Sequence, residues 1–353
     1  MTLSRRTALT GLGATALMAA CARGQQSQPA SVAGASLGEN WTSGPSLPIR
    51  VQEIYPAALN GTLYLAGGLS PDLGEGQIGI SDRFYALEPG ADRWRERARL
   101  SLPMHHPNLV ALENSVYAIG GFSAANGGGW SMSSAVRVYN PDLDAWSSGP
   151  AMPSAYAETV AAAIDGRIHV VTGRRPAGSS NSQWSHHADT NAHVVLDGAT
   201  GNWVTAAPAP TARNSAAGAV LDGQLHVVGG RTVSGGNTAA HEVYDPDSDR
   251  WERRAPLPDP NAGPVGAGGL AAASLNGQLY AFGGEWFDNS GGGVYSQVWA
   301  YNPQTDAWSE AGTMPTPRHG LGAVTLGDAI WTIAGAARAG GNETSAAVEV
   351  FSG

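Results

Sequence analysis

The chain has 353 residues, a formal net charge of −9 and 42% hydrophobic residues, a content that is ordinary for a folded globular protein. All 20 of its basic residues are arginines, and an acidic chain without a basic cluster argues against nucleic acid as a partner. No apolar run of 18 residues follows the N-terminal segment, so the sequence predicts no membrane span.

The first 20 residues are expected to be a targeting signal rather than part of the fold. The segment Ser4-Arg-Arg-Thr-Ala-Leu9 resembles a twin-arginine export signal. Cys21, the only cysteine, follows Leu17-Met-Ala-Ala20, which resembles the cleavage box of bacterial lipoproteins. Residues 21–39 are then a flexible tether, and Cys21 is either lipidated or simply lies at a cleaved signal. We expect export across the bacterial inner membrane to the periplasm or cell envelope.

Two features recur along the rest of the chain. Six tryptophans are spaced by 48 to 57 residues, at positions 41, 94, 146, 203, 251 and 308. A phrase with a turn and a glycine pair recurs between them, as in Asn60-Gly-Thr-Leu-Tyr-Leu-Ala-Gly-Gly68 and Asn276-Gly-Gln-Leu-Tyr-Ala-Phe-Gly-Gly284. Asn-Gly and Asp-Gly accept the positive φ angles of a two-residue hairpin. A period near 50 residues is typical of a β-propeller.

The order of glycine pair, tyrosine and tryptophan in each repeat resembles the kelch family. The tyrosine belongs to a Tyr-x-Pro ending of the third strand, as in Val138-Tyr-Asn-Pro141. The resemblance covers about Trp41 to Gly353 and implies an all-β, six-bladed kelch-type β-propeller over residues 40–353. Because the last repeat ends at Phe351-Ser-Gly353, before its tryptophan strand, we expect the Trp41 strand to complete the sixth blade.

Strand parity predicts that the long, divergent loops share one face of the propeller. In a four-stranded antiparallel blade, the loop between the second and third strands and the link between blades lie on the same side. The second-to-third loops here are long and variable, which is typical of binding surfaces on a rigid scaffold. They span roughly residues 69–82, 122–134, 174–192, 231–240, 285–296 and 336–346.

The links between blades supply the first group of candidate binding residues. Counting back nine residues from each turn gives His105, Tyr156, Arg213, Ala267 and Arg318, with Arg50 one residue out of step in the first repeat; all but Ala267 are polar or cationic. In the kelch family such links deliver a side chain to the mouth of the central channel, so the resemblance implies ligand contact there. Arginines at that mouth would favour an anionic group. The alternative is that they pair with Glu53, Glu158 or backbone carbonyls and so join adjacent blades.

Three tryptophans outside the repeat positions form the second group. Trp130, Trp184 and Trp286 lie in long loops, where an aromatic ring can stack on a sugar or anchor a protein partner. The alternative is that each ring fastens its loop to the blade beneath. The histidines near Asp189 have no spacing that defines a metal site, and we expect neither a metal nor a cofactor.

No catalytic set is evident, so the enzyme question stays open, and three functions remain. Copper radical oxidases with a kelch-like propeller need a cysteine beside the copper, and the propeller region has none. The leading hypothesis is an exported binding module for an anionic glycan, peptide or protein. The second is a sugar-isomerising enzyme similar to the six-bladed sialic-acid mutarotases, with acid and base candidates at Glu53, His105, Tyr156 and Glu158. The third is a structural subunit of an envelope complex.

Overall fold

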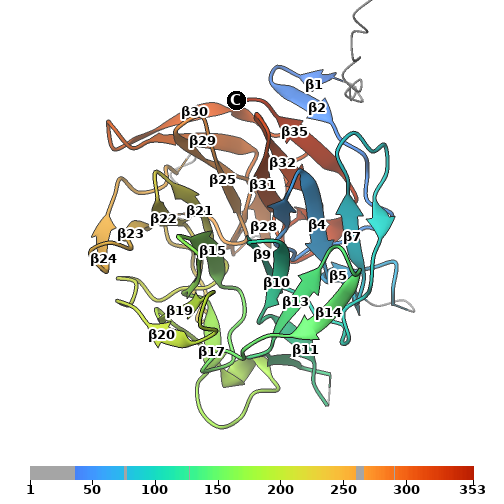
Figure 1. The fold of residues 1–353 in the computed structure, drawn as a ribbon. Helices are drawn as coiled ribbons and strands as arrows, with labels where there is room; N and C mark the ends of the chain where they lie inside the picture. The colour runs from blue at the N-terminus through green and yellow to red at the C-terminus, as the bar shows by residue number, and fades with distance from the viewer. Residues whose placement is uncertain (1–35, 75–77, 127, 260–265, 290) are drawn as a thin grey trace, which may run out of the picture. The chain divides into compact units, whose positions relative to one another are not determined.

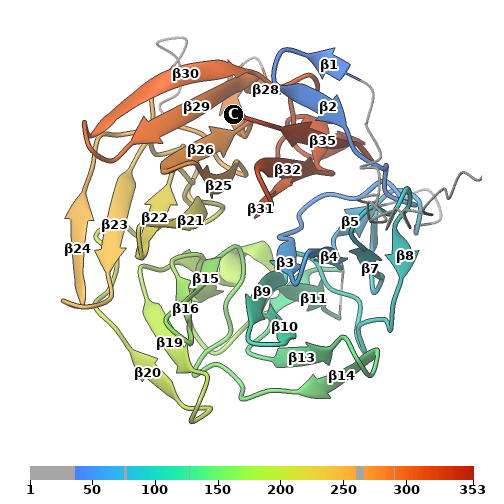
Figure 2. The same ribbon diagram turned by 45° about the horizontal axis from the view of Figure 1, so that its top comes forward.

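The computed structural model describes residues 36–353 except 75–77, 127, 260–265 and 290. The predicted export signal and Cys21 lie outside the described residues. Six antiparallel sheets are arranged as blades around a central axis, as predicted for a six-bladed all-β propeller (Figures 1 and 2). The 3-10 helix η1 (Trp184–His186) is a single turn, and none of the described helical segments could cross a membrane.

Each blade begins with its inner strand and proceeds outward (Figure 2). Blade one consists of β3 (Ala57–Leu59), β4 (Thr62–Ala66), β7 (Phe84–Leu87) and β8 (Arg95–Glu96). Blade two consists of β9 (Asn108–Leu112), β10 (Ser115–Ile119), β13 (Val136–Asn140) and β14 (Ala145–Ser148). Blade three consists of β15 (Val160–Ile164), β16 (Arg167–Val171), β19 (His193–Asp197) and β20 (Trp203–Thr205). Blade four consists of β21 (Ala217–Leu221), β22 (Gln224–Val228), β23 (His241–Asp245) and β24 (Arg250–Arg253). Blade five consists of β25 (Ala271–Leu275), β26 (Gln278–Phe282), β29 (Gln297–Asn302) and β30 (Ala307–Thr313).

The sixth blade joins the two ends of the propeller. Its C-terminal strands are β31 (Gly322–Leu326), β32 (Ala329–Ile333) and β35 (Val348–Phe351), and β2 (Trp41–Ser43) pairs with β35 in the register Trp41 to Phe351. The prediction that the Trp41 strand closes the ring is confirmed. A further strand, β1 (Ser36–Gly38), pairs with β2 and lies inside the segment for which the sequence predicts a tether.

Hydrogen bonds from the repeat tryptophans and from Asp144 join neighbouring blades. The indole Nε1 of Trp146 donates to the carbonyl of Ala98 in the link from the preceding blade, at 2.7 Å. The carboxylate of Asp144 accepts from the Tyr139 hydroxyl at 2.7 Å in its own blade and from the Ala98 amide at 3.0 Å. The tryptophan bond recurs in four other blades, at Trp94, Trp203, Trp251 and Trp308. These repeat tryptophans are therefore structural, as the sequence predicts.

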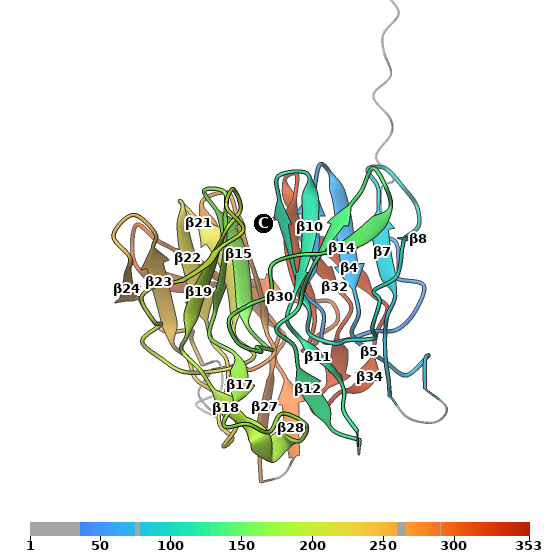
Figure 3. The ribbon, with the colours of Figure 1, turned by 60° about the horizontal axis from the view of Figure 1, so that its bottom comes forward.

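The long loops project from one face as small hairpins (Figure 3). Five of the six loops contain a two-stranded sheet. The hairpins are β5 (Leu69–Ser70) with β6 (Gly79–Ile80), β11 (Phe122–Ala124) with β12 (Trp130–Met132), β17 (Arg174–Pro176) with β18 (His187–Asp189), β27 (Glu285–Asp288) with β28 (Gly291–Val294), and β33 (Ala336–Arg338) with β34 (Asn342–Thr344). We call this side the long-loop face.

Candidate binding cavity at the channel mouth

A ring of six left-handed residues lines the central axis, one from each link between blades. Their φ angles lie between 51° and 63°, and they are Glu53, His106, Glu158, Ser215, Gly269 and Gly320. Five of these six residues donate their backbone N–H to the carbonyl of the neighbouring residue in this ring of links. For example, Gly320 donates to Gly269 at 2.8 Å and Glu53 donates to Gly320 at 2.7 Å. Left-handed backbone at non-glycine residues costs about 1–3 kcal/mol each and is concentrated at functional sites.

A cavity of about 530 Å³ opens on the long-loop face beside this ring. Loops from all six blades contribute to its wall, and the exposed part of the wall is mostly apolar. The apolar side chains are Leu69, Ile78, Trp130, Trp184, Val233 and Phe287. The size is within the usual range for a ligand site, about 300–1,000 Å³.

Seven ionisable side chains among the described lining residues form what we call the charged floor: Glu53, His106, Glu158, Arg174, Arg231, Glu285 and His319. Three of these residues belong to the left-handed ring. Arg174, Arg231 and Glu285 each follow the glycine pair, or its degraded form, in their repeat. Three carboxylates face two guanidinium groups, so one negative charge is in excess when both histidines are neutral.

Two arginines in the charged floor are held by glutamates. Arg174 Nε lies 2.5 Å from Glu158 Oε2, and Arg231 Nη1 forms an ion pair with Glu285 Oε1. The Arg174 guanidinium also lies 3.6 Å from the ring centroid of Trp184, which is half exposed at the rim of the cavity. This cation–π stacking links the charged floor to the aromatic wall.

His106 lies between two carboxylates. Its Nε2 is 2.7 Å from Glu53 Oε2 and 3.8 Å from Glu158 Oε1. Its Nδ1 is 2.7 Å from Nδ1 of His105, which is fully buried behind it. Burial lowers the pKa of His105 well below its usual value, and so does its neighbour His106. An imidazole held between carboxylates is an arrangement that can transfer protons.

Glu53 and Glu158 stay ionised although they are buried. Burial alone would raise the pKa of Glu53, but the neighbouring His106, His319 and Arg231 outweigh it and lower that pKa well below its usual value. Burial also opposes ionisation of Glu158, whose pKa is nevertheless lowered, mainly by Arg174. Glu53 and Glu158 therefore keep their negative charges throughout the neutral pH range.

Several buried polar atoms of residues that line the cavity have no hydrogen-bond partner in the described protein. They include Gln52 Oε1, Arg174 Nη1 and His319 Nδ1, all from residues that line the cavity. Leaving such an atom unsatisfied costs about 1–3 kcal/mol. A ligand that supplied donors and acceptors here would recover that free energy.

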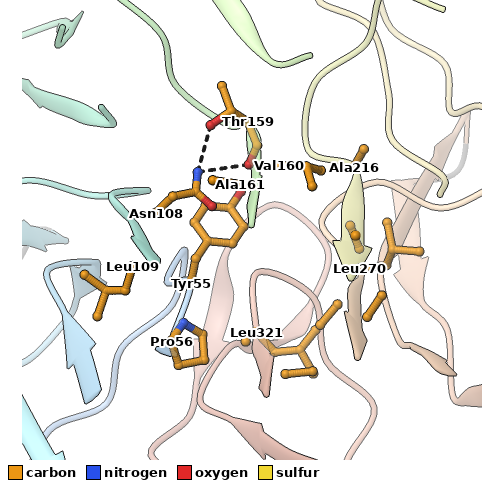
Figure 4. A pocket seen from close by; sticks show the side chains of 16 residues that line it. Tyr55, Pro56, Asn108, Leu109, Thr159, Val160, Ala161, Ala216, Leu270 and Leu321 are labelled. Carbon is orange, nitrogen blue, oxygen red and sulfur yellow. Dashed lines mark hydrogen bonds between the residues drawn. The ribbon is translucent and has the colours of Figure 1, made fainter. Parts of the chain in front are cut away.

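The channel on the other side of the ring is much narrower. Its cavity holds about 80 Å³, and its wall is formed mainly by small and aliphatic residues of the inner strands (Figure 4). Tyr55 lies in this cavity beside Asn108, whose side-chain amide donates to the carbonyl of Thr159 at 3.0 Å and to its hydroxyl at 2.8 Å. Of the two sides of the channel in the described residues, the long-loop side is the one with room for a ligand of ordinary size.

The structure places the three predicted arginines outside the cavity wall. Arg213 and Arg318 are fully buried inside their blades, where they form ion pairs with Glu242 at 2.5 Å and Glu349 at 2.6 Å. Arg50 is exposed and forms an ion pair with Asp72. The alternative, in which these arginines pair with glutamates, describes the two buried ones, although the partners differ from those expected and lie within the same blade.

The other predicted residues divide between the cavity and the scaffold. Trp130 and Trp184 line the cavity. His105 supports the wall from behind, with its ring centroid 4.3 Å from that of Trp130. Tyr156 is buried in the core between blades two and three. Trp286 is partly buried against the blade five core, near Tyr295, and is not part of the described cavity wall.

Sequence reasoning missed Arg174, Arg231 and His319 as cavity residues. A signal for the first two was present, because each is a charged residue directly after the glycine pair or its degraded form, where sibling repeats have Leu69, Phe122 and Ala336. His319 follows Arg318 by one residue. Counting along the links therefore identified segments that line the cavity. The residues at the counted positions Arg213 and Arg318, however, point into the blades.

The fold and cavity define the class of protein: a closed six-bladed propeller that presents a ligand-sized cavity on one face. The chain belongs to the kelch-repeat family. Residues 159–346 match the KLHDC2/KLHL20/DRC7 Kelch-repeats domain, and residues 103–153 match the Kelch motif. Propellers of this family are typically protein-interaction modules.

Individual relatives are distant in sequence. The chain is 24% identical to Kelch-like protein terF of Aspergillus terreus over 80% of its own length and 62% of that protein. It is 28% identical to mouse Kelch-like protein 35 over 74% of its length and 40% of that protein. The chain thus spans less than two thirds of these relatives. The solved structure of YjhT superposes with a TM-score of 0.71 at 18% identity, covering 86% of this chain and 95% of that one, which shows the shared fold.

Proposed function

We propose that the protein is an exported binding module that holds a segment of a protein partner on the long-loop face, with one group of that segment in the cavity. The observation that carries this proposal is the cavity itself, whose wall comes from the loops of all six blades. An apolar wall above a polar floor with unsatisfied atoms fits a peptide side chain or terminus. The typical role of kelch propellers supports a protein rather than a small metabolite.

The site of action in this proposal is the cell envelope. It rests on the twin-arginine-like segment within residues 1–20 and on Cys21, where a lipid anchor would hold the propeller at a membrane surface. Anionic peptides and anionic glycans are among the candidate ligands to be tested. The arginines that suggested an anionic ligand lie inside the blades, and both arginines of the charged floor already have a carboxylate partner.

A peptide library displayed on phage would test the proposal. We expect peptides selected on the wild-type protein to lose about 10-fold or more in affinity for the Trp184→Ala variant, because its ring covers Arg174 at the cavity rim. The matched control is Leu143→Ala, which removes an exposed apolar side chain from a turn between the third and fourth strands of blade two, on the opposite face. Selected peptides that bound both variants as tightly as the wild type would place binding elsewhere.

A second candidate function is favoured by the position of His106. An imidazole held between Glu53 and Glu158 beside an open cavity is a possible acid–base pair for opening and closing a sugar ring, a reaction that needs no cofactor. Exchange between the anomers of freshly dissolved sialic acid and of neutral sugars can be followed by NMR. Acceleration that His106→Gln abolishes would establish the enzyme, and uncatalysed rates would exclude it.

A further inference from the structure

The hairpin of blade five, β27 with β28, has main-chain groups that point outward along one edge (Figure 3). Glu285 exchanges two main-chain hydrogen bonds with Gly268 in the link: its N–H donates at 2.8 Å and its carbonyl accepts at 3.2 Å. The main-chain groups of Glu285 therefore point away from β28. Val294 lies opposite Glu285, and Gly292 lies two residues before Val294. Because inward and outward residues alternate along an antiparallel pair, the N–H and C=O groups of Gly292 and Val294 point away from β27.

These four groups form no hydrogen bond with any residue that the structure describes. Gly292 is exposed, Val294 is partly buried, and both line a groove of about 670 Å³ between this hairpin and the hairpin of blade six. The hairpin of blade six contributes Arg338, Ala339 and Asn342 to the groove. Proteins usually protect an outer strand with charged side chains, proline or a covering segment. The strand β28 consists of three glycines and a valine, so nothing in its own sequence blocks an added strand.

The equivalent edge in blade two is closed by a carboxamide. Met132 has in β12 the position that Val294 has in β28, because each lies opposite a residue that bonds to the link and precedes a residue whose N–H donates to the second glycine of the pair. The side chain of Asn181, from the loop of blade three, accepts from the Met132 N–H at 3.0 Å and donates to the Met132 carbonyl at 2.9 Å. A carboxamide offers a donor and an acceptor side by side, as a residue of an extended strand does. The amide on Met132 therefore indicates which chemistry fits the same edge of β28.

We propose that the outer edge of β28 is a docking site for an extended main-chain segment of the protein partner, which adds to the hairpin as a third strand. A single carboxamide can satisfy either Gly292 or Val294. An extended segment can satisfy both, because its own outward N–H and C=O groups recur at every second residue. Main-chain hydrogen bonds of this kind give affinity, and the side chains at alternate positions of the segment give specificity.

The Phe287 ring supplies the side-chain contact and connects the edge to the cavity. Phe287 lies opposite Gly292 and is half exposed, and a Cβ at Gly292 would lie 3.0 Å from its Cδ1. An apolar residue of the added segment opposite Gly292 would therefore contact the ring. Phe287 belongs to the walls of both the cavity and the groove. One partner segment can thus reach both, and in this respect the inference rests on the proposed function.

The peptides selected on the wild-type protein are the probe for this edge. Val294→Pro removes one outward N–H that takes no part in the hairpin ladder, so the hairpin should persist. We expect synthetic versions of the peptides to bind this variant about 10-fold more weakly. The matched control is Val294→Thr, which keeps the N–H and the branched shape and should bind as the wild type does. Methylation of successive main-chain nitrogens of a peptide should weaken binding at alternate residues.

Amide hydrogen exchange, measured by NMR, tests the edge in the unmodified protein. The N–H groups of Gly292 and Val294 should exchange rapidly in the free protein and about 10-fold or more slowly with a peptide bound. The Met132 N–H, which Asn181 accepts, should exchange slowly in both states and is the internal control. Unchanged exchange at Gly292 and Val294 with a peptide bound would overturn docking at this edge.

The variants also separate this site from the cavity. Peptides that lose affinity for Trp184→Ala but not for Val294→Pro would overturn the edge site and leave the proposed function standing. Loss for Val294→Pro alone would support the edge site and contradict binding in the cavity. A library without any peptide sensitive to Val294→Pro would overturn the edge site. So would a wild-type dimer that Val294→Pro dissociates, because the edge would then pair with a second copy of the chain.

Discussion

Two buried arginines of this propeller, one inside a blade and one at the cavity, show how similar burial can serve different roles. Arg318 is fully buried in blade six, and all three of its guanidinium nitrogens donate hydrogen bonds, to Glu349, Thr332 and backbone carbonyls. Arg174 is 1% exposed, but its Nη1 has no hydrogen-bond partner in the described protein; its Nε forms the ion pair with Glu158 and its Nη2 donates to Asn214 at 3.3 Å. A buried arginine is therefore not by itself a sign of a binding site. What distinguishes Arg174 is that it lies in a cavity wall and that its hydrogen bonding is incomplete.

The largest expected effect is on stability and would test this comparison directly. Arg318→Met leaves the carboxylate of Glu349 buried without its cation, so we expect the free energy of unfolding to fall by about 3–5 kcal/mol. Arg174→Met should cost less, because Glu158 faces the cavity and lies 3.8 Å from His106. Urea denaturation of both variants measures the difference. Equal losses would show that the two sites do not differ as the hydrogen bonds indicate.

A smaller effect is expected from the histidine pairs inside blades three and four. His226 Nδ1 lies 3.0 Å from His241 Nε2, and His241 Nδ1 lies 3.1 Å from the carbonyl of Ala255, contacts that two neutral rings satisfy when His226 Nδ1 donates to His241 Nε2. Burial lowers the pKa of His226 to about 3 and that of His241 to about 4. His169 and His193 form the same kind of pair in blade three, with pKa values of about 4, chiefly because both are buried.

These lowered pKa values predict acid lability with a definite sign. The unfolded chain binds protons near pH 6.5 and the folded blades do not, so this stabilisation is present above pH 6.5 and is lost as the pH falls towards about 4. We expect each histidine of a pair to account for about 1–2 kcal/mol of the loss between pH 7 and pH 5. His226→Gln combined with His241→Gln should show a shallower decline in melting temperature than the wild type. An unchanged pH slope would contradict neutral buried pairs.

The smallest expected effect concerns Arg50. Its ion pair with Asp72 is exposed, and screened surface pairs add little to stability. Because Arg50 is not among the described residues of the cavity wall, Arg50→Ala should change neither the melting temperature nor the affinity for selected peptides. A clear loss of peptide affinity would extend the binding surface beyond the cavity and restore the role that the sequence predicts for this residue.

Much of the fold could be predicted because the repeat encodes it locally. The turns at Asn60-Gly61 and Asn276-Gly277, with φ angles of 50° and 51° at the asparagines, form two-residue hairpins as expected. The pairing of Trp41 with Phe351 follows from a final repeat that lacks its last strand. Each of these features depends on a few adjacent residues or on simple counting of repeats.

The cavity could be predicted only in part. Trp130 and Trp184 were found because they lie in long loops and outside the repeat positions. Arg213 and Arg318 were selected for their charge, yet adjacent residues on a link point in opposite directions, and Arg318 enters the blade while His319 lines the cavity. A side chain inside a blade and a side chain in the cavity wall can thus be one residue apart in the sequence. Counting residues along divergent loops is not accurate enough to tell them apart.

The amino-acid sequence by itself determined the number of blades, their closure and the face that carries the long loops, because short-range turn chemistry and a 50-residue period specify these. Only the tertiary structure decided which charged groups meet. Glu53, His106 and Glu158 come from three different repeats and converge because left-handed links place them around one axis. Which of their atoms find partners depends on distances of a few ångströms between blades, and no local pattern in the chain encodes those distances.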